Sequence, residues 1–162
     1  MKTIFLDIDG VLNSNFWNDS HQKEISDGTL IDFDKVVLLS HFVKDTKAQI
    51  VLHSGWKYWF DENINPLRAE AENLLMQFDK VGISISGITP DLATEEIKRN
   101  KKFSLVKAKE ILLWLDNHPC EKWIVFDDLD LHNEIISKHQ IYTDPSVGLT
   151  QADLDRAYCL LE

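Results

Sequence analysis

Acidic and hydroxyl side chains directly follow three short apolar runs in this sequence. The sequence reads DIDG at residues 7–10, SG at 54–55 and DD at 127–128. If these groups meet, their carboxylates repel one another, and some must take up protons or share a cation. A hard divalent ion relieves this repulsion, and Mg²⁺ accepts a few carboxylates together with water and phosphate oxygens. The pattern therefore predicts a Mg²⁺ site that also holds a phosphate group.

These groups can meet only if the apolar runs before them are neighbouring parallel strands. Buried strands are expected at residues 3–6, 49–53 and 122–126, and two further strands at 82–88 and 140–143. Apolar residues at helical spacing predict helices at 30–44, 66–78, 104–117 and 133–138, and from residue 150 onward. This alternation predicts an α/β fold, a three-layer, doubly wound and mainly parallel five-stranded sheet. Ligands of such sheets bind beyond the carboxyl ends of the strands, where the strand order reverses.

Capping residues mark where several of these helices begin. The expected helix starts, in chain order, carry Asp32 or Thr29 as a cap, Pro66 in a first turn, Ser104 as a cap and Thr150 as a cap. Asp153 lies three residues after Thr150, which is a variant of the capping box. The inner stripe of this last helix is expected to contain Leu154, Ala157, Leu160 and Leu161.

Composition is that of a soluble globular protein. The chain has 162 residues, 44% of them apolar and 27% charged, which suits a single domain over residues 1–162. It has no apolar run near the ~20 residues that span a bilayer and no signal-peptide pattern, so a cytoplasmic protein without membrane contact is expected. Cys120 and Cys159 lack metal-type spacing and are expected to be reduced thiols. The net charge of −10 disfavours broad binding to nucleic acid, unless local positive charge or a bound cation attracts the anion.

Four segments resemble the motifs of the haloacid dehalogenase (HAD) superfamily, in the expected order. Residues 4–13 (IFLDIDGVLN) resemble the first motif, and Ser54 after an apolar strand resembles the second. Lys107 fits the third motif and residues 123–128 (WIVFDD) fit the fourth. The wording HSGWK at 53–57 is similar to a small branch of the superfamily that is grouped with nucleic-acid repair enzymes. The resemblance implies a phosphohydrolase on a sheet with minimal or no cap domain.

The resemblance also implies a role for each matching residue. Asp7 is the expected nucleophile, which forms an aspartyl-phosphate, and Asp9 is the expected general acid and base. Ser54 is expected to donate a hydrogen bond to a phosphoryl oxygen, and Lys107 to hold the nucleophile and the phosphate by charge. The expected ligands of Mg²⁺ are Asp7, the backbone carbonyl of Asp9 and Asp127, and direct binding by Asp128 is left open. An acid at position 9 suits a phosphatase, since the dehalogenases of the superfamily lack it.

Lys109 is an alternative to Lys107 as the third-motif residue. The two positions point about 200° apart on a helix, so only one of them can face the site. Lys107 is preferred because it lies nearer the start of its helix, and therefore nearer the carboxyl edge of the sheet.

The lack of room for a cap domain bears on the substrate. Residues 13–29 are too few for a folded insertion, and residues 57–103 are used up by a helix, a strand and a polar loop. An open site suits a large phosphorylated substrate, such as a nucleic-acid end or a phosphoprotein, unless a neighbouring subunit serves as a lid. The candidate substrate contacts are Gly55, Trp56 and Lys57.

Two further sets of side chains could meet the substrate. Six of the 17 basic residues fall within twelve positions and could form a rim that binds a polyanion: Lys98, Arg99, Lys101, Lys102, Lys107 and Lys109. Aromatic residues follow Ser54 and could either pack in the core or stack on a base: Trp56, Tyr58, Trp59 and Phe60.

Three other functions remain open at this point. The first is a phosphatase for a small molecule, a nucleotide or a sugar phosphate, that is closed by a partner subunit. The second is a non-catalytic module that binds phosphate or metal, although the intact Asp7 and Asp9 argue against it. The third is a phosphoacceptor signalling domain, which would lack the second acid of the DxD motif.

Overall fold

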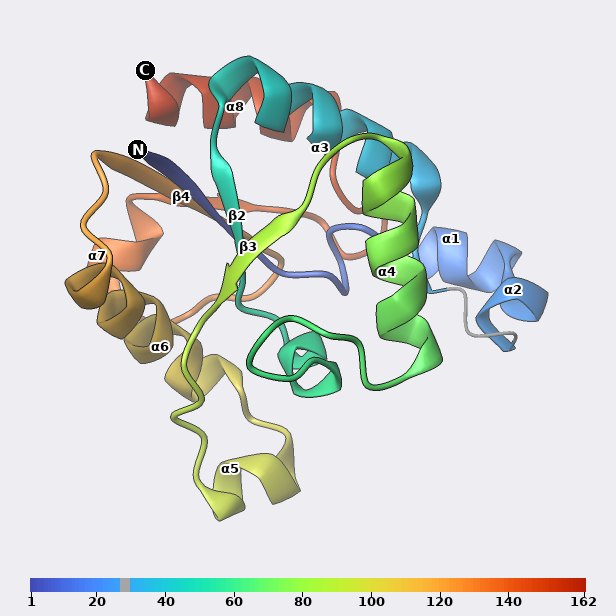
Figure 1. Ribbon diagram of the computed structural model, residues 1–162, viewed down its shortest axis with the longest axis horizontal. Helices are drawn as coiled ribbons and strands as arrows, with labels where there is room; N and C mark the ends of the chain where they lie inside the picture. The colour runs from blue at the N-terminus through green and yellow to red at the C-terminus, as the bar shows by residue number, and fades with distance from the viewer. Residues whose placement is uncertain (27–29) are drawn as a thin grey trace.

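A single parallel sheet forms the centre of the protein, and a computed structural model describes residues 1–26 and 30–162 of it (Figure 1). The strands of the described part are β1 (Lys2–Leu6), β2 (Gln49–Leu52), β3 (Ile85–Ile88), β4 (Lys122–Asp127) and β5 (Gln140–Tyr142). They lie in the order β3-β2-β1-β4-β5, and every neighbouring pair is parallel. The predicted doubly wound α/β sheet is confirmed, and the described strands contain no antiparallel pair.

The strand order reverses between β1 and β4. From β1 the chain winds outward through β2 to β3, then crosses to the other side of β1 and continues through β4 to β5. Leu6 pairs with Phe126 in the β1–β4 register, so Asp7 and Asp127 come next to each other at the carboxyl end of the sheet. Connections that leave in opposite directions open a crevice at this point, which is where parallel sheets bind ligands.

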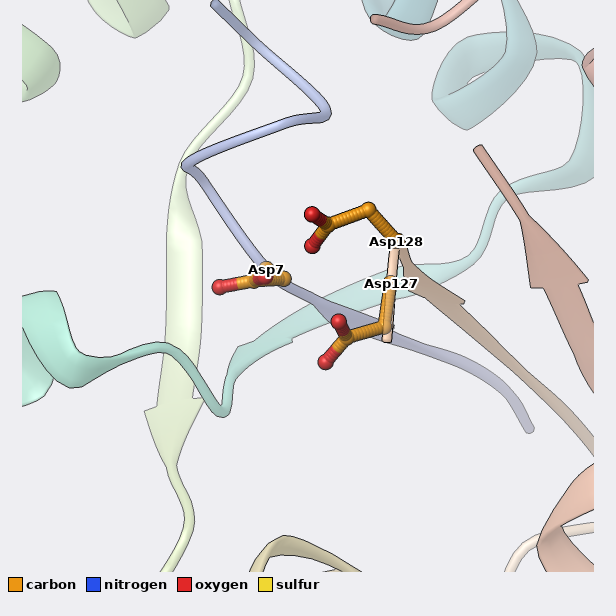
Figure 2. A group of neighbouring side chains, drawn as sticks. All are labelled: Asp7, Asp127 and Asp128. Atoms are coloured by element: carbon orange, nitrogen blue, oxygen red, sulfur yellow. The ribbon is translucent and has the colours of Figure 1, made fainter. Parts of the chain in front are cut away.

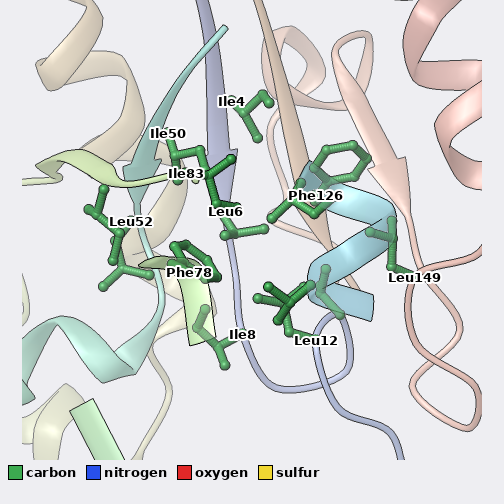
Figure 3. Packing of buried hydrophobic residues seen from close by; sticks show 14 of the residues in the cluster. Ile4, Leu6, Ile8, Leu12, Ile50, Leu52, Phe78, Ile83, Phe126 and Leu149 are labelled. Atoms are coloured by element: carbon green, nitrogen blue, oxygen red, sulfur yellow. The ribbon is translucent and has the colours of Figure 1, made fainter. Parts of the chain in front are cut away.

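Side chains alternate between the two faces of the sheet, as the two-residue period of a strand requires. Ile4 and Leu6 of β1 belong to one core cluster, and Phe5 between them belongs to the other. The first cluster lies under α3 (Phe33–Thr46), α4 (Ala69–Lys80) and α8 (Gln151–Leu161), and the second lies under α6 (Ser104–Asn117) and α7 (Glu134–Ser137). Figure 3 shows how Phe126 of β4 and Phe78 of α4 fill the larger cluster around Leu6.

Local capping explains where two of the long helices begin. Asp32 caps α3 by accepting a hydrogen bond from the backbone of Asp34, whereas the alternative, Thr29, lies outside the described residues. Thr150 and Asp153 form the capping box at the start of α8, as predicted. The stripe of α8 differs from the prediction at Leu160, which is 38% exposed because Leu154, Ala157 and Leu161 already fill the inner face.

Three predicted boundaries are wrong because other contacts compete at those positions. Pro66 lies outside α4, since it pairs with Phe60 in a short bridge before the helix begins. Ser104 is the first residue of α6, and Phe103 occupies the capping position without a side-chain hydrogen bond. Strand β3 begins at Ile85 and not at Gly82, whose left-handed backbone (φ 73°) ends the turn after α4.

Four short helices in the described part of the chain lack an apolar repeat and were not predicted from the sequence. They are α1 (Asn15–Ser20), α2 (Gln22–Ser26), the 3₁₀ helix η1 (Gly55–Trp59) and α5 (Glu95–Asn100). Ser14, Ser54 and Thr94 cap α1, η1 and α5 with their hydroxyl oxygens. In Figure 1, α5 lies at the bottom, away from the layers that cover the sheet. Among the described residues, no helix is both long enough and apolar enough to cross a membrane.

Replacing Phe126 tests the packing of the central layer. Phe126 is fully buried and meets Phe42 of α3 edge to face, so Phe126→Ala should lower the free energy of unfolding by about 3–5 kcal/mol. Phe16 of α1 is 74% exposed, and Phe16→Ala should change that free energy by less than about 0.5 kcal/mol. Urea denaturation of the two variants measures both values, and equal losses would contradict the arrangement of the core.

Candidate active site

Three carboxylates meet at the crevice between β1 and β4 (Figure 2). Asp7 follows β1 directly, and its backbone N–H donates to the carbonyl of Phe126 at 3.0 Å, which anchors it to β4. Asp127 ends β4 and Asp128 follows it. One carboxylate oxygen from each of these three acids lies within 4.8 Å of the others. Asp7 near the start of the chain and the pair Asp127 and Asp128 therefore lie at one site, as expected.

Asp127 is fully buried, and protein donors occupy both of its carboxylate oxygens. Its Oδ1 accepts from the backbone of Leu129 at 2.9 Å, and its Oδ2 lies 2.8 Å from Nε2 of His53 and 2.9 Å from Nζ of Lys107. Burial alone would raise the pKa of Asp127, but His53 and Lys107 together hold it well below its usual value. Asp127 is therefore a carboxylate of fixed orientation, and His53 is a site residue that the sequence pattern did not reveal.

Lys107 connects two of the acids. Its Nζ lies 2.9 Å from Asp127 and 3.4 Å from Asp7, and the side chain is buried. Burial by itself would lower the pKa of Lys107, yet the charges of Asp7 and Asp127 hold it above its ordinary value, so the amine stays charged. Lys109 is exposed on the other side of α6. Of the two candidate lysines, the structure places Lys107 at the acids.

Within the cluster of three acids, Asp7 and Asp128 have raised pKa values. Burial raises the pKa of Asp7 to about 6 against the opposing charge of Lys107. Burial, followed by the charges of Asp7 and Asp127, raises the pKa of Asp128 to about 7. A cation would relieve both shifts, and an all-oxygen set of carboxylates fits a hard ion such as Mg²⁺. The cluster can thus bind a metal ion.

Gly10 allows Asp128 to come this close to the loop after β1. A Cβ atom at Gly10 would lie 2.7 Å from Cγ of Asp128, and its backbone has a φ of 82°, a left-handed conformation that side chains disfavour. The carbonyl of Gly10 accepts from the hydroxyl of Thr143 at 2.8 Å, which ties the loop to the segment after β5. The glycine of the DIDG motif is required by this close approach.

Asp9 lies beside the three-acid cluster and points its carboxylate at two neutral donors. Nδ2 of Asn13 donates to Oδ1 at 2.9 Å, and Nε1 of Trp56 donates to Oδ2 at 3.2 Å. Asn13 is the residue of the first motif whose role the sequence did not disclose; its position four residues after Asp9 was the available signal. The placement of Asp9 as a metal ligand through its carbonyl stays a prediction.

Ser54 and Lys57 belong to the same turn but face different surroundings. Oγ of Ser54 accepts from the backbone of Trp56 at 3.1 Å, which leaves the hydroxyl hydrogen free to donate. Nζ of Lys57 pairs with Glu110 at 2.6 Å and donates to the carbonyl of Pro90 at 3.1 Å. Lys57 is buried and lines a different pocket, so the structure does not bring it together with Asp7, Gly55 and Trp56.

A pocket of about 500 Å³ gathers most of the predicted site residues. Its lining includes Asp7, Asp9, Ser54, Gly55, Trp56, Lys107 and Asp128. Five further residues complete the wall: Trp59, Lys101, Phe103, Ser104 and Leu129. Trp59 and Lys101 belong to the aromatic and basic sets named from the sequence, whereas the other three were not assigned to the site. Asp127 lies behind the pocket surface, where it holds Lys107.

Only some members of the clustered basic residues and of the aromatic residues after Ser54 line this pocket. Of the six clustered basic residues, Lys101 and Lys107 line this pocket, whereas Lys98 pairs with Asp91 at 3.3 Å. Trp56 packs in the core, as one of the two alternatives for the aromatic set stated, and it also lines the pocket. Stacking of an aromatic residue on a base stays a prediction.

The raised pKa values of Asp7 and Asp128 predict how metal binding depends on pH. Lowering the pH from about 8 to about 5.5 protonates both acids, and those protons must leave before a cation can bind. The dissociation constant for Mg²⁺ should therefore rise at least about tenfold over this range. Calorimetric titration at both pH values measures this constant, and the variant Asp128→Asn should bind Mg²⁺ more weakly than the wild-type protein. A constant independent of pH would contradict the assignment of these acids to the metal.

The family of the chain follows from comparison with known proteins. Residues 3–154 match the family model described as the HAD domain in Swiss Army Knife RNA repair proteins. Comparisons with curated proteins and with solved structures gave no match. The match covers most of the chain, and it confirms the resemblance to the HAD superfamily and to its nucleic-acid-repair branch. The chain belongs to the family of HAD domains of Swiss Army Knife RNA repair proteins.

Proposed function

We propose that this protein is a Mg²⁺-dependent phosphomonoesterase that works through a phosphorylated Asp7. The observation that carries the proposal is the convergence of Asp7, Asp9, Ser54 and Lys107 on one pocket, next to the pair of acids at the end of β4. Membership of the HAD superfamily supports hydrolysis as the reaction class.

In the first step the substrate's phosphoryl group moves to Asp7. A carboxylate oxygen of Asp7 attacks phosphorus, the bond from phosphorus to the ester oxygen breaks, and Asp9 gives its proton to that leaving oxygen. Lys107, 3.4 Å from Asp7, supports the ionised form that attacks. The hydroxyl of Ser54 is free to donate to a phosphoryl oxygen. Asp7, Asp127 and Asp128 with the carbonyl of Asp9 would hold Mg²⁺, which neutralises phosphate charge and so favours attack.

In the second step water releases the phosphate. Asp9 takes a proton from the water, the water oxygen bonds to phosphorus, and the bond from phosphorus to Asp7 breaks. The products are an alcohol and inorganic phosphate, and Asp9 again carries the proton that it needs for the next turnover. A second acid at position 9 distinguishes this cycle from that of a phosphoacceptor domain, which keeps its phosphoryl group for longer.

The substrate we propose is the phosphorylated end of a nucleic-acid strand. The pocket beside Asp7 has aromatic walls, Trp59 and Phe103 among them, and a positive side chain at Lys101. Aromatic rings can stack on bases, and the charged amine of a lysine can bind a second phosphate. The net charge of −10 opposes long electrostatic contact with a polyanion, so recognition would be confined to the last one or two nucleotides. The description of the family, which names RNA repair, supports this substrate class.

Two substitutions test the catalytic cycle. Asp7→Asn should lower hydrolysis of p-nitrophenyl phosphate with Mg²⁺ by more than about 10³-fold, because the amide cannot act as the nucleophile. Asp9→Asn should trap a phosphorylated protein, since the good leaving group departs without an acid but the water lacks its base. Mass spectrometry detects the added phosphoryl group. Asp79→Asn, at an exposed position of α4, is the matched control and should retain full activity. A wild-type protein that binds phosphate without turnover would favour the non-catalytic module.

Lys101 provides the test of the substrate class. Lys101→Ala should raise KM for a 3′-phosphorylated oligonucleotide about 5–10-fold, because one phosphate contact is lost, and should leave KM for p-nitrophenyl phosphate within about twofold. Steady-state kinetics with both substrates measures the difference. Lys109→Ala removes an exposed lysine of α6 and serves as the control for net charge. A preference of the wild-type protein for mononucleotides or sugar phosphates over oligonucleotides would favour the small-molecule phosphatase instead.

A further inference from the structure

The carboxylate of Asp9 is clamped between two segments that are distant in sequence. Asn13, four residues along the β1 loop, donates to Oδ1 at 2.9 Å. Trp56, in η1 after β2, donates to Oδ2 at 3.2 Å through its indole nitrogen. Asp9 is otherwise exposed to solvent, where a free carboxylate would rotate about its side-chain bonds. Two donors on two oxygens fix the plane of the carboxylate.

Both donors are themselves held in place. Asn13 is buried, its Oδ1 accepts from the backbone of Gly10 at 3.0 Å, and its Nδ2 also donates to the carbonyl of Leu30 at 2.8 Å. With these bonds the amide has one orientation only. Trp56 is 2% exposed and its ring lies against Trp59, with 4.7 Å between the ring centroids. Because neither donor can rotate, the two hydrogen bonds fix the orientation of the Asp9 carboxylate.

Trp56 also connects Asp9 to Ser54. Its backbone N–H donates to Oγ of Ser54 at 3.1 Å, while its indole N–H donates to Asp9. One residue thus sets the position of a side chain after β1 and of another after β2. Both of these side chains line the pocket beside Asp7.

We propose that Trp56 and Asn13 are positioning residues, which aim Asp9 at the ester oxygen that leaves phosphorus. This inference rests on the proposed function. Each donor is neutral and occupies one lone pair of its oxygen, so a second lone pair on each oxygen stays available for the proton that passes to the leaving group. Neutral donors orient the acid without adding a charge that would compete with Lys107 for Asp7. A misplacement of about 1 Å can cost about 10²-fold in rate, so such a clamp has a measurable effect.

The way in which the loss of activity depends on the leaving group shows whether Trp56 positions Asp9 or only packs in the core. Trp56→Phe keeps an aromatic ring in the core and removes only the indole N–H. An alkyl phosphate needs the acid, because its alkoxide is a poor leaving group, whereas p-nitrophenyl phosphate needs it little. The variant should therefore lose about 10–100-fold in kcat/KM with the alkyl phosphate and less than about threefold with p-nitrophenyl phosphate. The ratio kcat/KM reports the transfer to Asp7, in which the acid acts.

Trp114→Phe is the control, since Trp114 is another buried tryptophan that packs on Phe5 in the cluster under α6. It should change both substrates equally and by less than about twofold. If the wild-type protein is active and Trp56→Phe loses the same factor with both substrates, or loses none with either, the positioning role is overturned. A wild-type protein without activity on either ester would instead refute the proposed function.

A second measurement does not depend on activity or on the stability of the tryptophan variant. The chain has five tryptophans, so an ¹⁵N-labelled sample should give five indole N–H signals. Asp9→Asn should move one of them, because the acceptor loses its charge, and Asp79→Asn on α4 should move none. If Asp9→Asn leaves all five signals in place, the indole of Trp56 does not donate to Asp9 and the inference fails.

Discussion

The buried contact of Lys107 with Asp127 and Asp7 is the interaction on which the site depends. It joins α6 to β4 and to the residue after β1, at the point where the strand order reverses. Two ionised carboxylates can share this buried space only beside a positive charge, because an unpaired buried charge is costly and is otherwise neutralised by a proton. The lysine therefore compensates the acids and at the same time sets the distance between the helix and the sheet.

Helix α6 makes a second buried ion pair one turn later. Glu110 lies three residues after Lys107, on the same face of the helix, and pairs with Lys57 of η1. The same carboxylate of Glu110 accepts from the backbone of Leu92, in the segment after β3. The loops that follow β2 and β3 are thus both tied to α6. These ties explain how the short, polar segments of residues 53–60 and 89–94 hold their place beside a pocket of about 500 Å³.

The two acids of the DxD motif have opposite surroundings although they are only two residues apart. Asp7 is buried beside a lysine and two other acids, where charge governs its behaviour. Asp9 is exposed and is held by an asparagine and a tryptophan, where direction governs it. In the proposed cycle, Asp7 bonds to phosphorus and Asp9 exchanges a proton with the leaving group or with water. The separation of roles comes from neighbours supplied by η1 and α6, since the two residues themselves are identical.

The sequence by itself determined the sheet, the helices that cover it and the edge at which the acids meet. Apolar runs and helical repeats are local patterns, and a parallel sheet necessarily brings the residues after its strands to one edge, so Asp7 and Asp127 could be placed together. Tertiary structure alone decided the partners: His53 and Asn13 as supporting residues, Lys57 turned to Glu110, and Trp56 turned to Asp9. The physical reason is that a long side chain takes its direction from charges and donors brought close by the fold, and residues far apart in the chain supply them.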